Sequence, residues 1–153
     1  MILDANPPCG TCEAAEASLA ARGRRDPPRL LVADDDPDMR ALVASALRHD
    51  GYAVAEASCG AEVLERLEPD GEGDIGFDGV VSDVRMPGLG GLDIVAELRG
   101  GGVTIPILLI TAFGDEATHL EADRLGATAL LDKPFELHDL RMAVLNLVPL
   151  RKT

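Results

Sequence analysis

Four short segments of the sequence carry side chains that could act together chemically. Three acids, Asp34–Asp36, follow a short apolar run. Asp83 lies inside another apolar run, where a hydrophobic residue would be expected. Thr111 and Lys133 each follow a further apolar run. Because an unpaired buried charge is unfavourable, a carboxylate at position 83 requires a partner.

Carboxylates that lie close together need a proton or a cation between them. Two of them about 5 Å apart repel by roughly 3 kcal/mol at an effective dielectric constant of about 20. Oxygen ligands of this kind favour a hard ion such as Mg²⁺. Lys133 adds an ammonium suited to a phosphoryl oxygen, and Thr111 adds a hydroxyl donor. A metal ion, an ammonium and a hydroxyl around one carboxylate are the groups that form an aspartyl phosphate.

The chain pattern predicts how these residues come together. Short apolar runs at about 30–33, 52–57, 80–81, 105–110 and 129–131 predict strands. Amphipathic patterns between them predict helices over 37–50, from about 60 to 67, and over 89–99, 115–125 and 135–147. Apolar strands that alternate with helices indicate a parallel sheet covered on both faces. Functional residues in such sheets gather at the carboxyl ends of the strands.

Several residues predict where these helices begin and end. Asp36 before Pro37 predicts a helix start, and Gly51 predicts its end. Ser58 is expected to cap the next helix. The segment 69–76 is rich in glycine and acids and predicts a surface loop, and the glycines at 88, 90 and 91 suit a turn.

Composition predicts a single soluble domain. The 153 residues are 46% hydrophobic and 27% charged, with 14 basic and 27 acidic residues and a net charge of −13. That charge argues against direct nucleic-acid binding. No apolar stretch of about 18 residues predicts a membrane span, and three cysteines, an odd number, predict a reduced, cytoplasmic setting.

The ends of the chain differ from its middle. Residues 1–28 contain two Pro-Pro pairs and an Ala-rich stretch, and we expect a flexible extension, with a helical docking segment as the alternative. Residues 29–149 form the expected domain, and 150–153 a short tail. Cys9 and Cys12 lack the neighbouring ligands of a zinc site.

The sequence resembles the receiver domains of two-component response regulators, which include the CheY-like proteins, over about residues 29–148. Four segments in the family's order carry the resemblance: Leu30–Pro37, Ser82–Gly88, Leu109–Asp115 and Asp132–Phe135. The family implies a flavodoxin-like (βα)5 fold, a doubly wound parallel sheet with strand order 2-1-3-4-5.

The resemblance also implies a role for each site residue. Asp83 would accept a phosphoryl group from a histidine kinase or a histidine phosphotransfer protein. Asp34, Asp35, Asp83 and the Arg85 carbonyl would bind Mg²⁺ or Mn²⁺. Lys133, before a cis-proline, would pair with the phosphoryl oxygens.

Further implications concern signalling. Thr111 would move to bind the phosphoryl group, with the backbone at Ala112 and Arg85 beside it. The chain would catalyse only its own phosphorylation and dephosphorylation, and would signal by a conformational change to a downstream protein or an output domain outside this sequence. A homodimer is also possible in the family. Leu130 replaces the aromatic residue that many receivers use as a switch, and Phe113 and Arg85 occupy positions that tune the phosphoryl lifetime.

Three other functions fit parts of the pattern. A haloacid-type phosphatase would use Asp34 and Asp36, but would require an additional cap and a different spacing of later residues. A flavodoxin-like cofactor carrier would need a first loop that binds phosphate, which three acids repel. A degenerate receiver would act only as a protein-interaction module, without phosphorylation.

Overall fold

A five-stranded parallel sheet forms the centre of the molecule. The computed structural model describes residues 25–112 and 115–150. The strands lie in the order β2-β1-β3-β4-β5, and all four neighbouring pairs are parallel. Their bounds are β1 Arg29–Ala33, β2 Ala53–Ala57, β3 Gly79–Asp83, β4 Ile107–Thr111 and β5 Ala129–Asp132. This arrangement confirms the predicted flavodoxin-like fold.

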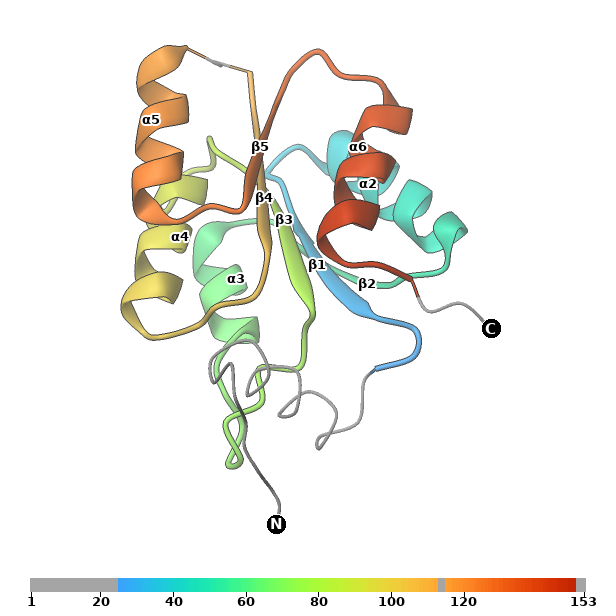
Figure 1. Cartoon of the computed structure of the whole chain (residues 1–153), viewed down its shortest axis with the longest axis vertical. Helices are drawn as coiled ribbons and strands as arrows, with labels where there is room; N and C mark the ends of the chain where they lie inside the picture. Colours follow the sequence, from blue (N-terminus) through green and yellow to red (C-terminus); the bar gives the residue numbers. More distant parts are fainter. Residues whose placement is uncertain (1–24, 113–114, 151–153) are drawn as a thin grey trace, which may run out of the picture.

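Helices cover both faces of the sheet. Three of them, α3, α4 and α5, lie on one face, and α2 and α6 lie on the other (Figure 1). Their bounds are α2 Pro37–Asp50, α3 Gly60–Arg66, α4 Gly91–Gly100, α5 Glu116–Leu125 and α6 Leu137–Leu147. Each face has its own apolar core, because β3 and β4 are buried at every residue and send side chains alternately to the two sides.

The helix ends follow mostly from predicted capping residues. Asp36 caps α2 and accepts hydrogen bonds from the amides of Asp38 and Met39. Gly51 ends this helix in the left-handed region, at φ 116°, which a residue with a Cβ rarely adopts. The cap predicted at Ser58 is wrong by one residue. Cys59 is the N-cap of α3, and the amide and hydroxyl of Ser58 instead donate to the side chain of Glu62.

Two helices begin later than their apolar patterns predict. Helix α4 begins at Gly91 rather than Leu89, because the amide of Gly90 is held by the side chain of Asp93 at 3.0 Å. Gly91, expected in a turn, is therefore helical. Helix α6 begins at Leu137 rather than Phe135, with Glu136 as its N-cap.

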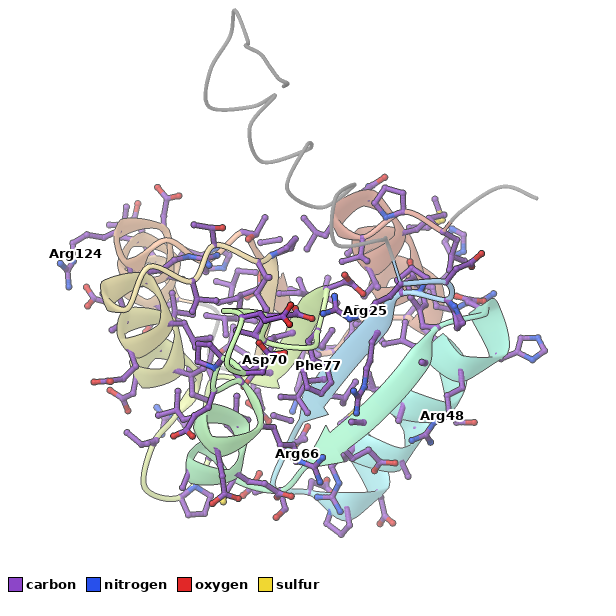
Figure 2. All side chains as sticks on the ribbon, turned by 90° about the horizontal axis from the view of Figure 1, so that it is seen from below. Arg25, Arg48, Arg66, Asp70, Phe77 and Arg124 are labelled. Atoms are coloured by element: carbon purple, nitrogen blue, oxygen red, sulfur yellow. The ribbon has the colours of Figure 1, made fainter. Side chains whose placement is uncertain are left out.

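The predicted loop at 69–76 lies at the end of the sheet opposite the carboxyl ends of the strands. Arg25, Asp70 and Phe77 lie near one another there (Figure 2). The guanidinium of Arg25 pairs with Asp74 and Asp78, and the Pro28 carbonyl accepts from the amide of Ala53. Residues 25–28 thus contact the domain, whereas the rest of the predicted extension lies outside the described residues.

None of the helices in the described ranges is both long enough and apolar enough to cross a membrane.

Candidate functional site

Three carboxylates meet at the carboxyl ends of two adjacent strands. Asp34 and Asp35 follow β1, and Asp83 is the last residue of β3. Each offers an oxygen atom, and these oxygen atoms all lie within 4.8 Å of one another. Asp34 is 4% exposed and Asp83 is 7% exposed, whereas Asp35 faces solvent. The topology therefore brings together the acids that the sequence predicted as metal ligands.

Both oxygen atoms of Asp83 are held by hydrogen-bond donors. The amide of Arg85 donates to Oδ1 at 3.0 Å, in a tight turn after the strand. The ammonium of Lys133 donates to Oδ2 at 3.1 Å. This pairing lets a carboxylate be buried at a position where an apolar residue was expected.

The side chain of Lys133 reaches Asp83 across the end of β4, which lies between β3 and β5 in the sheet. It follows β5, its amide donates to the carbonyl of Thr111 at 2.7 Å, and a cis peptide bond joins it to Pro134. Thr111 ends β4 and is fully buried, and Ala112 after it is exposed. Leu130 lies on β5, half-buried against the core beneath α3, α4 and α5.

The carboxyl group of Asp34 is strongly affected by its surroundings. Burial raises the pKa of Asp34 to about 6 from an ordinary value of 3.8. The hydrogen bond from the Asp36 amide to its Oδ1, at 3.0 Å, opposes this rise in pKa, and the neighbouring charge of Asp83 adds to it. A cation beside these oxygens would reverse the shift, since it favours the ionised form.

Replacing Asp34 with Asn should stabilise the metal-free chain. An acid whose pKa is higher in the folded state binds its proton more tightly there, so stability falls as pH rises from about 3.8 to about 6 and stays lowered above. We expect Asp34→Asn to raise the free energy of unfolding by about 1–2 kcal/mol above pH 7. The amide oxygen can still accept from Asp36. Urea titrations at several pH values measure the difference.

The pH dependence separates this effect from a general change in packing. The advantage of Asp34→Asn should shrink as pH falls through about 6 and vanish well below 3.8, where the unaltered carboxyl is protonated in both states. Added Mg²⁺ should stabilise the unaltered chain more than the variant. An advantage that is constant with pH, or a variant less stable at pH 7, would contradict this account.

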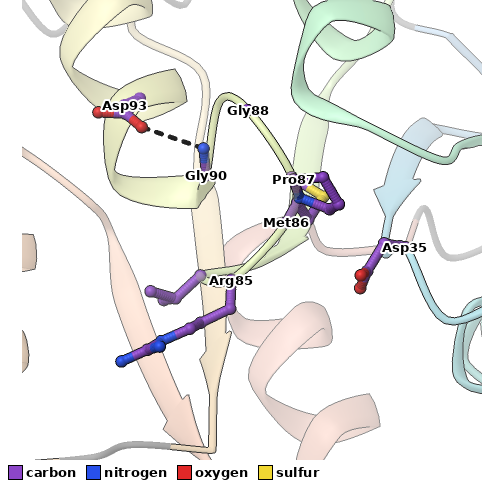
Figure 3. A pocket seen from close by; sticks show the side chains of 8 residues that line it. Asp35, Arg85, Met86, Pro87, Gly88, Gly90 and Asp93 are labelled. Atoms are coloured by element: carbon purple, nitrogen blue, oxygen red, sulfur yellow. Dashed lines mark hydrogen bonds between the residues drawn. The ribbon is translucent and has the colours of Figure 1, made fainter.

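An open depression adjoins the carboxylates. It has a volume of about 440 Å³ and lies between Asp35 and the loop that follows β3. Figure 3 shows the side chain of Arg85 extending away from Asp35, and the hydrogen bond from Gly90 to Asp93 on the far side of the loop. The open side leaves Asp35 accessible to small solutes.

Some residues at this edge were not predicted from the sequence. Arg40 in α2 donates from Nη1 to the backbone carbonyl of Asp34 at 2.9 Å. The ring of His119 in α5 lies with Nε2 at 3.0 Å from Oδ1 of Asp132. Both rely on tertiary neighbours, for which the sequence carries no signal. Phe113 lies outside the described residues.

The donor set fits a hard divalent cation. The three clustered side chains all offer carboxylate oxygens, and two of them, Asp34 and Asp83, are buried, so that unbalanced charge is unfavourable. Burial is the main cause of the raised pKa of Asp34, and the charge of Asp83 adds to it. Mg²⁺, which keeps several waters and uses few carboxylates, suits a site with one open side.

Comparison with known proteins gives a consistent result. Residues 30–145 match the family described as the response regulator receiver domain. The transcriptional regulatory protein TcrA of Mycobacterium tuberculosis is 37% identical over 130 residues, which are 85% of this chain and 49% of TcrA. Response regulator MprA of the same species is 38% identical over 112 residues, 73% of this chain and 46% of MprA. This chain thus spans about half the length of these relatives.

Solved structures show the same similarity. Chemotaxis protein CheY4 of Vibrio cholerae superposes with a TM-score of 0.70 and 30% identity, covering 78% of this chain and 98% of CheY4. The receiver domain of the Francisella response regulator 1452 has a TM-score of 0.72 and 26% identity, covering 79% of this chain and 96% of that one.

Proposed function

This chain belongs to the response regulator receiver domain family, and from that premise we propose that Asp83 is its phosphoryl acceptor. The observation that carries the proposal is the position of Asp83, buried at the end of the central strand with a donor on each oxygen. An Asp83 oxygen attacks phosphorus, and the bond from phosphorus to the donor group breaks with its electron pair on the leaving group. A carboxylate attacks as an anion, so this step needs no general base.

Lys133 would act on the charge that moves during this transfer. Its ammonium lies 3.1 Å from Oδ2 of Asp83, within reach of a phosphoryl oxygen attached to that carboxylate. Thr111 and the backbone of Ala112 end the neighbouring strand and would bind the remaining oxygens. Because the phosphoryl group would contact Lys133 and Thr111 better in one state than in the other, phosphorylation would shift an existing conformational equilibrium.

We further propose Mg²⁺, or Mn²⁺, as the cofactor. Asp34, Asp35, Asp83 and the Arg85 carbonyl would hold the ion. When bound, it neutralises charge on the transferring phosphoryl group. The Arg85 amide and the Lys133 ammonium hold the carboxylate of Asp83 in place.

The partners follow from the same premise. The phosphodonor would be a histidine kinase or a histidine phosphotransfer protein in the cytoplasm, and the signal would pass to a downstream protein or an output domain. Because Leu130 stands where many receivers have an aromatic switch, Thr111 would carry the conformational change without it. Phe113 and Arg85 would set how long the phosphoryl group lasts. The family match favours this function over a phosphatase or a flavin carrier.

Intact-mass measurement tests the proposal directly. After incubation with acetyl phosphate and Mg²⁺, we expect the chain to gain the mass of one phosphoryl group. Removal of the ion with a chelator should suppress this gain. A chain that gains no mass under either condition would favour the alternative of a receiver that acts only as an interaction module.

A further inference from the structure

We propose that Arg40 is a positioning residue that holds the acidic loop after β1, Asp34–Asp36, in the geometry needed for divalent-ion binding. The proposal rests on the function above, since it concerns the same ion. Arg40 lies in the first turns of α2, and its half-buried guanidinium contacts two different elements. Nη1 donates to the carbonyl oxygen of Asp34 at 2.9 Å, and Nε donates to Oε1 of Glu56 at 3.2 Å.

These two bonds fix the start of the loop to its neighbours. Glu56 belongs to the edge strand β2, and Asp34 follows β1, so the guanidinium joins α2 to the ends of both strands. The planar guanidinium can hold two acceptors at once in a fixed relation, which an ammonium cannot do in the same way. The carbonyl of Asp34 belongs to a residue that is 4% exposed, so this donor also satisfies a backbone group largely shielded from water.

The loop needs such support because its charges repel one another. The carboxylates of Asp34, Asp35 and Asp83 lie within 4.8 Å before any ion is bound. Repulsion of this kind favours a wider loop, with the acids further apart. Arg40 holds the carbonyl oxygen of Asp34, while the Asp36 amide holds the carboxylate of the same residue. The Arg40 guanidinium and the Asp36 amide together fix the orientation of the carbonyl and of the carboxylate of Asp34.

A positioning role and a purely electrostatic role predict opposite results. Arg40 brings a positive charge close to an anionic cluster, and a cation there weakens the attraction for a divalent ion. If charge were its whole effect, removing Arg40 would strengthen ion binding. If it holds the loop, removing it weakens ion binding, as loss of groups that orient metal ligands does in other proteins.

Arg48 provides a matched comparison. It lies on the same helix, carries the same charge, and donates to the other oxygen of the same partner, Oε2 of Glu56, at 3.1 Å. Its second bond goes to the carbonyl of Val54 on β2, away from the acidic loop. Figure 2 labels Arg48 beside the edge strand. Replacing it removes the same charge and the same kind of contact to Glu56, but leaves the Asp34 carbonyl untouched.

The experiment measures Mn²⁺ affinity, by the free-ion signal in electron paramagnetic resonance, for the unaltered chain and for Arg40→Met, Arg40→Lys and Arg48→Met. We expect Arg40→Met to weaken binding about tenfold. Arg48→Met should bind as tightly as the unaltered chain or slightly more tightly. Arg40→Lys, which keeps the charge but not both bonds, should remain several-fold weaker than the unaltered chain. Hydrogen exchange should show faster exchange of the Asp36 amide in both Arg40 variants, without Mn²⁺.

Each contrary outcome is specific. Arg40→Met binding as tightly as Arg48→Met, or full affinity in Arg40→Lys, would overturn the positioning role while leaving the proposed function standing. Failure of the unaltered chain to bind Mn²⁺ would overturn both. If Arg40→Met does not fold, as thermal melting would show, affinity and amide exchange in Arg40→Lys decide the question.

Discussion

Asp83→Asn should abolish the incorporation of a phosphoryl group. The amide side chain has nearly the same shape as the carboxylate and can still accept a hydrogen bond from the Arg85 amide. It carries no negative charge, however, and is a far weaker nucleophile toward phosphorus. Intact-mass measurement after acetyl phosphate and Mg²⁺ should therefore show no added mass, while the unaltered chain is labelled.

A matched substitution tests whether the loss of any exposed carboxylate would reduce labelling in the same way. Asp123 is an exposed acid on α5, away from the carboxyl ends of β1 and β3, and Asp123→Asn makes the same chemical change there. This variant should be labelled like the unaltered chain, and both variants should melt cooperatively. Labelling of Asp83→Asn to the level of the control would assign the acceptor role to another carboxyl group, with Asp34 and Asp35 as the nearest candidates.

The fold could be predicted from the sequence largely because its three inner strands, β1, β3 and β4, are buried. A strand such as β4, buried at all five positions, needs mostly apolar side chains, and this requirement is visible as the apolar run Ile107–Ile110 before Thr111. The same topology explains why the site could be predicted. Asp34, Asp83 and Lys133 are far apart in the sequence, yet each follows or ends a parallel strand, and parallel strands present their carboxyl ends at one edge.

Contacts that use the backbone could not be predicted in the same way. Arg40 donates to a carbonyl, and every residue has a carbonyl, so no residue type at the acceptor position marks the pair. On the sequence Arg40 is one of several basic residues of an amphipathic helix. The predicted cap of α3 is wrong for a related reason. Ser58 is a good capping residue, but its amide and hydroxyl donate to the side chain of Glu62. The N-cap is therefore the next residue, Cys59.

Gly91 allows two backbone segments to approach closely rather than allowing a turn. Its backbone is helical, so conformational freedom is not what the position requires. A Cβ there would lie 2.6 Å from the carbonyl oxygen of Asp83 and 3.0 Å from Cδ2 of Leu109. Only the absence of a side chain lets α4 begin directly against the end of the central strand. There the amide of Gly91 donates to the Val84 carbonyl at 2.9 Å.

Gly91→Ala should therefore lower the free energy of unfolding by about 3 kcal/mol, toward the upper end of the usual cost of overpacking. The cost is high because the nearest blocking atom belongs to the backbone and cannot rotate away. Gly100→Ala is the matched control, since Gly100 is the last residue of the same helix and a Cβ there meets no atom within 4 Å. It should stabilise the chain by up to about 1 kcal/mol, through helix propensity.

Urea titration of both variants separates the two effects, provided that the slope with denaturant is unchanged. A Gly91→Ala chain within about 0.5 kcal/mol of the unaltered one would show that the loop after β3 yields easily. A rigid loop has a further consequence, because the backbone that a Cβ displaces is that of Asp83 itself. A shift of the Asp83 carbonyl would also move the carboxylate that this residue carries, so the surviving folded fraction of Gly91→Ala should be labelled more slowly by acetyl phosphate.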